Sequence, residues 1–413
     1  MVICVVVVDI SGYQGKTTKK TPGYAQDVKV LTGTNLSRDD EMKKGNLTAI
    51  SLFAGCGGDT LGLENAGLNV IGFVENWKTA IQTHKKNFPN SEFIGESVEG
   101  DMVKISDAEF EKFKGKVDIL FAGFPCQGFS HAGKKDPNDK RNKLFWEFVR
   151  ATKLIKPKWI IGENVAGLIH RKTDDGISKV PNVIVSAFES IGYNMAEPKV
   201  LKAEEYGVPQ KRRRVFFVGS REGIDFKFPK PIYTKGNFPT IRKIIEPTNV
   251  NSVKINPSDV HELNNEGILY YDSDEEPVGK AHPYLIRKLK ERKISFGRRI
   301  SPYHIEVANL DSPTKTIHCG YSFQPRLFAG IKNRKGFFVR EFTNSELAQI
   351  QGFPKEYKFA GKREDIIKQI GNAVPPKLVE VIAKKIASIE LLPPKKSYSR
   401  NNLNHYLEKP ITS

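Results

Sequence analysis

The sequence predicts a doubly wound α/β fold with a mostly parallel sheet, joined to a smaller, irregular domain. From Leu47 onward, short apolar runs alternate with helical stretches, as in TAISLFAG, NVIGFVEN and TAIQTHKKNF. Strands that alternate with helices form parallel sheets covered on both faces. Such sheets bind ligands at the carboxyl ends of their strands, so functional residues are expected in the turns that follow these runs.

The alternation continues through VDILFAG, WIIGENV and VFFVGS and stops near Arg221. Residues 221–338 are rich in Pro, Asn, Lys and Arg, and their basic stretch LIRKLKERKISFGRR suggests a helix around Arg287 to Arg299. Helical periodicity returns in FTNSELAQI and in KLVEVIAKKIASIE. The second region is therefore expected to be an irregular domain followed by helices.

The charge of the chain favours a polyanionic partner. The formal net charge is +18 and the pI is about 9.5, which points first to nucleic acid and second to an anionic membrane surface. The sequence has no apolar run long enough for a transmembrane helix, and the opening MVICVVVVDI is expected to be a strand rather than a signal peptide.

The cysteines argue against structural zinc and against a disulfide framework. Cys4, Cys56, Cys126 and Cys319 are scattered, with no CxxC pair and no histidine at zinc-finger spacing. We therefore predict no metal site and a reducing compartment.

The stretch SLFAGCGGDTLGLENAG leads from a strand through a glycine-rich turn into a helix, an order that places backbone amides close to a ligand. Gly55 and Gly57 belong to the turn, but Thr60 replaces the third glycine of a dinucleotide fingerprint, which disfavours a pyrophosphate. Glu75, at the end of the second strand, is placed to accept ribose hydroxyls. Asp101, near the expected end of the third strand, is placed to accept from an adenine amino group. Together they indicate a nucleoside ligand such as S-adenosylmethionine; the alternative is a tight turn without a ligand.

A lone cysteine follows the strand VDILFAG in the glycine-rich stretch FAGFPCQGFSHAGKK. From its position alone, Cys126 is either a small buried hydrophobic residue or a nucleophile.

Several ordered motifs resemble those of the DNA (cytosine-5-)-methyltransferase family. GFPCQGFS, IIGENVAGL and YGVPQKRRRVFFVGSR resemble its Pro-Cys loop, its Glu-Asn-Val strand end and its arginine motif. FAGCGG resembles the cofactor loop, RNKLFWEF the next helix, REFTNSELAQIQGFP the late Arg-Glu-Gln block of Arg340, Glu346 and Gln351, and QIGNAVPP the final Gly-Asn motif. The resemblance extends from Leu47 to Ile389 and implies an S-adenosylmethionine-dependent methyltransferase fold that acts on carbon 5 of a flipped-out cytosine in a specific double-stranded DNA sequence.

The resemblance also implies catalytic roles. Cys126 would add to carbon 6 of the cytosine, and Glu163 would hold nitrogen 3, with Asn164 orienting it. Arg212 and Arg214 match the paired arginines of the family, with Arg214 beside the cytosine carbonyl oxygen. No side chain is recognisable as the base that removes the carbon 5 proton; a water or hydroxide is the alternative.

The resemblance also implies contacts to the cofactor, and these residues belong to several of the motifs named above. Two departures concern this site: Asn76 and then Trp77 follow Glu75, where the family often has a large apolar residue directly, and Ser51 replaces a frequent Asp. Cys56 is expected to pack beneath the loop. The implied contacts are Phe53, Gly55, Gly57, Glu75, Asp101, Met102, Pro125, Leu144 and Asn372.

We accordingly expect an N-terminal extension (1–45), a catalytic and cofactor-binding domain (46–220), a target-recognition domain (221–360), a C-terminal helix returning to the catalytic domain (361–390) and a tail (391–413). The enzyme is expected to be a monomer that modifies DNA either with a cognate restriction endonuclease or alone. It would be cytoplasmic and nucleoid-associated in a prokaryote, or nuclear in a eukaryote.

Three alternatives compete with this prediction. A tRNA methyltransferase of the same fold characteristically has a Cys-Phe-Thr motif, whereas Cys319 lies in HCGYS. An inactive DNA-binding regulator would have no use for Cys126, Glu163 and Arg214 together. A nicotinamide oxidoreductase is disfavoured by the missing third glycine and by the charge.

Overall fold

The computed structural model describes residues 47–125, 140–173, 176 and 178–390. The chain divides into two units, Met1–Gly45 and Asn46–Ser413, and every described residue belongs to the second. The predicted N-terminal strand, Cys126 and the tail 391–413 therefore lie outside the described residues.

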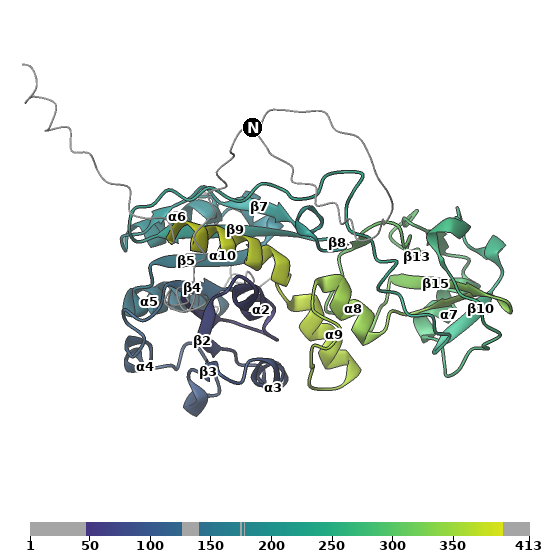
Figure 1. Ribbon diagram of the computed structural model, residues 1–413, viewed down its shortest axis with the longest axis horizontal. Helices are drawn as coiled ribbons and strands as arrows, with labels where there is room; N and C mark the ends of the chain where they lie inside the picture. The colour runs from purple at the N-terminus through teal and green to yellow at the C-terminus, as the bar shows by residue number, and fades with distance from the viewer. Residues whose placement is uncertain (1–46, 126–139, 174–175, 177, 391–413) are drawn as a thin grey trace, which may run out of the picture. The chain divides into compact units, whose positions relative to one another are not determined.

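The main sheet confirms the predicted fold class. Eight strands pair in the order β3-β2-β1-β4-β5-β9-β6, with β7 also on β9, and the five strands from β3 to β5 are parallel (Figure 1). The strands are β1 Thr48–Leu52, β2 Asn69–Val74, β3 Glu92–Phe93, β4 Ile119–Ala122, β5 Trp159–Val165, β6 Asn194–Met195, β7 Lys199–Lys202 and β9 Arg213–Ser220.

One strand of the predicted series has the opposite direction. VFFVGS lies in β9, which is antiparallel to β5 and also to β6 and β7. The chain reaches β9 from β7 by a short connection, and a short connection joins antiparallel neighbours because parallel strands need a longer crossover.

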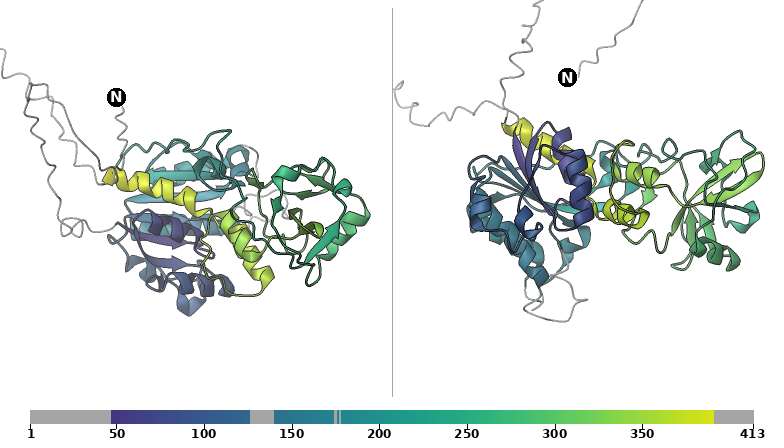
Figure 2. Two further views of the ribbon diagram at one scale, coloured as in Figure 1. Left: turned by 45° about the vertical axis from the view of Figure 1, so that its right-hand side comes forward. Right: turned by 90° about the horizontal axis from the view of Figure 1, so that it is seen from below.

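Helices cover both faces of this sheet, because successive strand residues point to opposite sides. On β4, Leu120 and Ala122 join a core with α4, α5 and α6, while Ile119 and Phe121 join a second core with α2 and α10. Figure 2 shows the helices on the two sides of the sheet. The bounds are α2 Gly58–Asn65, α3 Lys78–Asn87, α4 Asp107–Glu111, α5 Lys140–Ile155, α6 Val180–Glu189 and α10 Pro376–Glu390.

A smaller sheet with its own apolar core follows. Its strands are β10 Ser252–Ile255, β11 Leu269–Tyr270, β12 Ile294–Phe296, β13 Ile305–Val307, β15 Leu327–Asn333 and β16 Gly336–Arg340. The helix expected around Arg287 to Arg299 was predicted too long. The helix α7 spans only Pro283–Lys290, and Ile294–Phe296 form the buried strand β12, whose backbone pairs with β13.

Two further helices connect the cores. The helices α8 (Asn344–Gln351) and α9 (Arg363–Asn372) pack with Ile241, Leu327 and Cys56 in one cluster. The predicted helices FTNSELAQI and KLVEVIAKKIASIE are confirmed as α8 and α10. The short strands β8 (Gln210–Lys211) and β14 (Thr314–Lys315) pair in parallel and place residues 314–315 beside the arginine motif.

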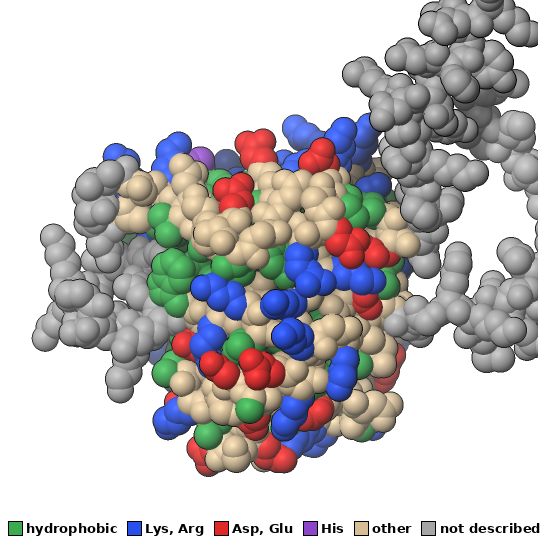
Figure 3. Space-filling view, turned by 90° about the vertical axis from the view of Figure 1, so that its left-hand side faces the viewer, with side chains coloured by type: hydrophobic (Ala, Val, Ile, Leu, Met, Phe, Trp, Pro, Cys, Tyr) green, Lys and Arg blue, Asp and Glu red, His purple; other side chains and the backbone are tan. Residues whose placement is uncertain are grey.

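Among the described residues, no helix is long and apolar enough to cross a membrane. Figure 3 shows the face of the molecule on the left-hand side of Figure 1, where Lys and Arg side chains lie among Asp and Glu side chains. On this face the positive charges are mixed with negative ones, so it does not present one continuous basic field.

Candidate active site

A cavity of about 500 Å³ lies at the carboxyl ends of β1, β2, β4 and β5, where a sheet of this kind binds ligands. It collects residues from motifs that are far apart in the sequence, and we call it the central cavity. Of the predicted site residues, those that line it are Phe53, Gly55, Glu75, Asp101, Met102, Pro125, Leu144, Glu163, Arg214 and Asn372.

The glycine-rich turn forms one wall of the central cavity. Gly55 has φ +55° and open space at the position of a Cβ, so the backbone there is accessible to a ligand. Gly57 has φ +87° but does not line the cavity; a Cβ there would lie 2.5 Å from the ring of Phe88. Gly57 is thus required by the tight packing of the turn against α3 and its following residue.

Glu75 joins this turn to the end of β2. One carboxylate oxygen accepts from the backbone N–H of Gly55 at 2.8 Å, and the other accepts from those of Asn76 at 2.9 Å and Trp77 at 2.8 Å. Burial raises the pKa of this carboxyl group, while the three N–H groups oppose that rise. Glu75 is therefore held in a single position at the edge of the cavity.

Two aromatic side chains, Phe53 and Trp77, also line the central cavity. Phe53 has φ +58°, an uncommon conformation for a residue with a side chain, and such outliers concentrate at functional sites. Trp77 lines the cavity as well, and the Lys368 ammonium lies 4.5 Å from the centre of its ring. Both rings are available to contact a planar group bound in the cavity.

The expected position of Asp101 was wrong. The strand β3 ends at Phe93, and Asp101 follows the 3-10 helix Glu96–Val98 in a turn, where its carboxylate accepts from Val103 N–H at 3.2 Å. The third strand is cut short at the sheet edge, but the turn still brings Asp101 to the central cavity.

An acid and an arginine face each other at the other end of the cavity. Glu163 is 6% exposed on β5, and Arg214 Nε on β9 lies 2.8 Å from its Oε1. The two residues come close because β5 and β9 are paired neighbours. Burial raises the pKa of the Glu163 carboxyl group, and the charges of Arg214 and Arg212 oppose this rise. A carboxyl group in such surroundings can hold a proton and share it with a ligand.

The segment that leads to Cys126 passes this acid. Gly123 follows β4, and a Cβ at this glycine would lie 3.7 Å from Glu163 Oε2. Gly123, Phe124 and Pro125 all line the central cavity. Cys126 itself lies outside the described residues.

Asn164 contacts this segment rather than Glu163. Its Nδ2 donates to the carbonyl of Phe124 at 2.9 Å, and its Oδ1 accepts from Val165 N–H at 2.8 Å. Asn164 therefore braces the end of β4 just before Pro125.

Arg212 does not line the central cavity. It is 1% exposed, and its guanidinium donates to the carbonyls of Gly371 and Ala373, both at 2.9 Å, and of Ile317 at 3.3 Å. Burial lowers its pKa to about 9, helped by the charge of Arg214. The geometry gives Arg212 a bridging position behind the cavity, between the final motif and the loop after β14.

Sequence reasoning missed Asp59, which lines the central cavity and is 3% exposed. The Ser51 hydroxyl donates to its Oδ2, and burial raises the pKa of Asp59 to about 7. Ser51 stands where the family often has Asp, and the carboxylate beside this position comes from Asp59 in α2 instead. The signal available in the sequence was the unusual acid directly after GCGG.

Cys56 is buried beneath the loop, as expected. Its thiol contacts the carbonyl of Gln369 at 3.7 Å, and burial raises its pKa well above the ordinary value. A thiol in this state is a poor nucleophile.

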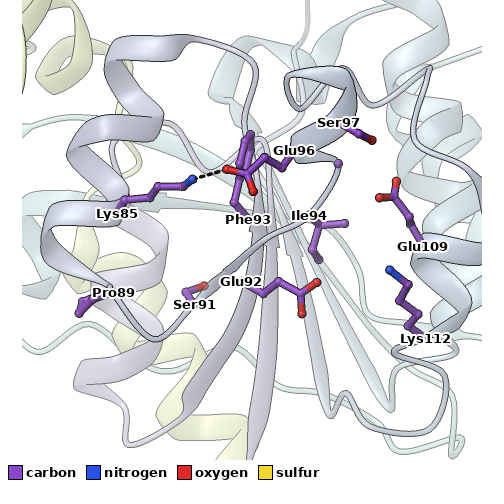
Figure 4. A pocket seen from close by; sticks show the side chains of 11 residues that line it. Lys85, Pro89, Ser91, Glu92, Phe93, Ile94, Glu96, Ser97, Glu109 and Lys112 are labelled. Carbon is purple, nitrogen blue, oxygen red and sulfur yellow. Dashed lines mark hydrogen bonds and ion pairs between the residues drawn. The ribbon is translucent and has the colours of Figure 1, made fainter.

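A second cavity, of about 560 Å³, lies at the β3 edge of the sheet (Figure 4). Lys85, Glu92, Glu96, Glu109 and Lys112 surround it, and Lys85 pairs with Glu96 at 2.7 Å. None of the predicted site residues lines it, so the chemistry indicated by the sequence belongs to the central cavity.

The central cavity suits a nucleoside with a cationic tail. Glu75 and Asp101 supply acceptors, Phe53 and Trp77 supply rings, and Asp59 supplies a buried carboxyl group. No cluster of metal-ligating side chains occurs in the part of the chain that the structure describes.

The fold is that of a doubly wound α/β protein with a cavity at the carboxyl ends of its strands, and comparison shows the family. A family model described as C-5 cytosine-specific DNA methylase matches residues 47–388, so the chain belongs to this family. The predicted enzyme class is therefore confirmed, and membership implies S-adenosylmethionine as methyl donor and DNA as substrate.

Named relatives agree with this assignment. The chain is 34% identical to the Type II methyltransferase M.Eco47II of Escherichia coli, over 85% of this chain and 81% of that protein. It is 33% identical to the Type II methyltransferase M1.HphI of Haemophilus parahaemolyticus, over 83% and 87% of the two chains.

Solved structures are similar in fold. A mutant DNMT2 of Spodoptera frugiperda gives a TM-score of 0.59 at 17% identity, covering 83% of this chain and all of the other. A candidate DNA modification methyltransferase from an E. coli prophage gives 0.55 at 22% identity, covering 84% and 99%. These likenesses concern the fold alone.

Proposed function

We propose that this enzyme methylates carbon 5 of a flipped-out cytosine in a specific double-stranded DNA sequence, through a transient bond between Cys126 and carbon 6. The observation that carries the proposal is the convergence of three motifs on one cavity: the glycine-rich turn, the end of β4 that leads to Cys126, and the Glu163–Arg214 pair. This convergence supports a site in which a methyl donor and a flipped cytosine would bind together, with Glu163 next to the cytosine.

S-adenosylmethionine would supply an electrophilic methyl group attached to a sulfonium. Glu75 would accept from the ribose hydroxyls with the oxygens that already hold the turn, and Asp101 would accept from the adenine amino group. Phe53 and Trp77 would contact the adenine ring. Met102, Pro125, Leu144 and Asn372 would complete the walls of the site, with Gly55 presenting its backbone.

The cytosine would be activated by two linked steps, a nucleophilic addition and a proton transfer. The Cys126 thiolate adds to carbon 6, and the proton on Glu163 moves to nitrogen 3, which turns the ring into an enamine. Carbon 5 would then take the methyl group as its bond to the sulfonium breaks, which leaves a neutral thioether. A water or hydroxide would remove the carbon 5 proton, elimination would release the Cys126 thiolate, and the nitrogen 3 proton would return to Glu163. Burial favours the protonated state of Glu163 that the first step needs.

One further side chain would act on the reacting groups, and two would position their surroundings. Arg214 pairs with Glu163 through its Nε and would donate to the cytosine carbonyl oxygen. Asn164 holds the backbone before Pro125, and Arg212 holds the final motif against the loop after β14. The last two are positioning residues.

The test is covalent trapping. DNA that carries 5-fluorocytosine at the target should form a complex with the protein and S-adenosylmethionine that survives denaturation, because fluorine cannot leave as a cation. Cys126→Ser should abolish the complex, and Cys56→Ser should retain it. Trapping by the Cys126 variant, or trapping of transfer RNA in place of DNA, would refute the proposal.

We further propose that this methylation protects DNA from a cognate restriction endonuclease. The support is the similarity to Type II methyltransferases of bacteria, which also favours the prokaryotic alternative of a cytoplasmic enzyme acting on the nucleoid. Plasmid DNA from cells that express the protein should resist an endonuclease of the same specificity, and complete digestion would argue against it.

A further inference from the structure

A third cavity, of about 530 Å³, lies between the β8–β14 pair and the start of β15. We call it the basic cavity. None of the residues that line it is acidic. Its lining residues are Lys211, Arg299, Lys315, Thr316, His318, Gly320, Tyr321, Gln324, Arg326 and Leu327.

The basic cavity lies beside the central cavity. Lys211 lines it from β8, and Arg214 lines the central cavity from β9, three residues further along the same chain segment. A Cβ at Gly371, which lines the central cavity, would lie 2.4 Å from the backbone nitrogen of Cys319. The loop of His318 and Cys319 therefore separates the two cavities.

The charges around this loop are concentrated and positive. The pKa of His318 is lowered by burial and then by the charges of Arg212, Arg299, Arg214 and Arg326. Adjacent arginines differ here: Arg298 is paired with Glu262 at 2.8 Å, whereas Arg299 faces the basic cavity. Lys315 is paired with Glu306. The positive charge that a polyanion would meet in the basic cavity is therefore that of Lys211, Arg299 and Arg326, which have no ion pair with another described residue.

Arg326 has the geometry of a reading side chain. Its carbonyl accepts from Glu306 N–H at 3.0 Å, which fixes the backbone at the start of β15, and its Nη2 donates to Gln324 Oε1 at 3.2 Å. Gln324 in turn donates from Nε2 to the Tyr284 hydroxyl at 3.1 Å. The backbone of Arg326 is fixed by the sheet, and one nitrogen of its guanidinium is bound by Gln324. The remaining N–H donors of the guanidinium therefore point in a defined direction.

The rim of the basic cavity favours nucleic acid over a small anion. Phe323, the chain neighbour of Gln324, is 78% exposed, and Ile300, the neighbour of Arg299, is also exposed. Next to arginines, such side chains suit base edges and thymine methyl groups.

We propose that Arg326 reads a guanine close to the target cytosine by donating to its O6 and N7, with Gln324 as its support. The inference rests on the proposed DNA-methylating function. A guanidinium makes two parallel bonds to a guanine edge, which an ammonium cannot reproduce. The basic cavity lies beside the central cavity, so the guanine is expected among the bases close to the flipped cytosine.

The experiment uses the full-length enzyme, S-adenosylmethionine and a DNA library randomised around a central cytosine. Sequencing of the methylated products gives the DNA motif that each enzyme methylates, for the wild type and for Arg326→Lys. The lysine keeps the positive charge but cannot donate two parallel hydrogen bonds. The lysine variant should lose preference for one guanine by roughly 10- to 100-fold and keep the other positions. Gln324→Ala should weaken the same position less.

The matched control is Arg334→Lys, because Arg334 lies in the turn between β15 and β16 and is paired with Asp272 and Asp274. The motif of this variant should be that of the wild type. An unchanged motif in Arg326→Lys, an equal loss of methylation on all sequences, or a wild-type motif without such a guanine would overturn the inference. Absence of any methylation by the wild-type enzyme would instead refute the proposed function.

Discussion

Replacing Asp59 by asparagine is expected to stabilise the protein at pH 8, with a smaller effect at pH 5. Asp59 is 3% exposed, and burial is the main cause that raises its pKa from 3.8 to about 7. The Ser51 hydroxyl lowers this pKa and the charge of Glu163 raises it. The ionised carboxylate is thus disfavoured in the folded protein, whereas a neutral amide of the same shape is not.

The sign and the magnitude follow from linkage. A carboxyl group whose pKa is higher in the folded state binds more protons when folded, so its contribution to stability falls as the pH rises from about 4 to about 7 and is constant above. The change from 3.8 to about 7 corresponds to roughly 4 kcal/mol as an upper estimate, at about 1.4 kcal/mol per unit. Asparagine can still accept from Ser51, so little of this gain should be lost.

The assay is urea denaturation of the wild-type enzyme and Asp59→Asn at pH 5, 6.5 and 8, with the slopes compared to confirm a common transition. The difference between the two proteins isolates Asp59 from the other titrating groups. Ser51→Ala is the companion variant, because removing the donor should move the pH window upward. A variant that is less stable than the wild type at pH 8, or a difference that does not depend on pH, would refute the reasoning.

Three further predictions concern the site and its support. Glu163→Gln keeps the shape of the side chain but removes its proton, so single-turnover methylation should slow about 10²- to 10⁴-fold with cofactor affinity retained; a fall of less than tenfold would contradict general acid catalysis. Glu75→Ala should weaken S-adenosylmethionine binding at least about tenfold in titration calorimetry, since a hydrogen bond to a charged group contributes about 1.5–3 kcal/mol; an unchanged Kd would mean that Glu75 only braces the turn. Arg340→Met leaves the buried carboxylate of Glu346 without its bidentate partner and should lower the free energy of unfolding by about 3–5 kcal/mol. Adding Glu346→Gln should recover part of that loss, and a single-variant loss below about 1 kcal/mol would count against the prediction.

The parts of the fold that were predictable are those in which one physical signal dominates. The alternation of apolar runs and helical stretches gave the strands β1, β2, β4 and β5 because both faces of each strand are buried. The helix α8 carries a capping box between Thr343 and Glu346, a local feature that the sequence FTNSE displays directly.

The errors arose where pairing with distant residues decides the structure. The basic stretch after Pro283 has mostly good helix formers up to Lys293, yet the helix ends at Lys290 and Arg292 adopts φ +52°. The segment Ile294–Phe296 then pairs with β13. The direction of β9 likewise depends on its partners β6 and β7, which periodicity does not reveal.

The site was predictable where its residues follow from the carboxyl ends of parallel strands. Glu75 and Glu163 come at or just before the ends of predicted strands, so their meeting in one cavity follows from parallel pairing. The roles of Arg212 and Asn164 depend on backbone carbonyls that belong to other motifs, and no pattern in the sequence identifies those partners.

Those partners form a buried network that relates recognition to chemistry. Gln210 donates to Gln351 Oε1 at 2.7 Å and accepts from Ile317 N–H at 3.0 Å, while Gln351 donates to the carbonyl of Ala373 at 2.6 Å. Arg212 donates to the same carbonyl at 2.9 Å.

Each of these groups is buried, so an unsatisfied member would cost about 1–3 kcal/mol. That cost keeps the loop after β14 in one register against the strand that carries Arg214. The late Arg-Glu-Gln block and the arginine motif therefore act together as a rigid connection, which fixes the distance between the side chains that would read DNA and the acid that would act on the cytosine.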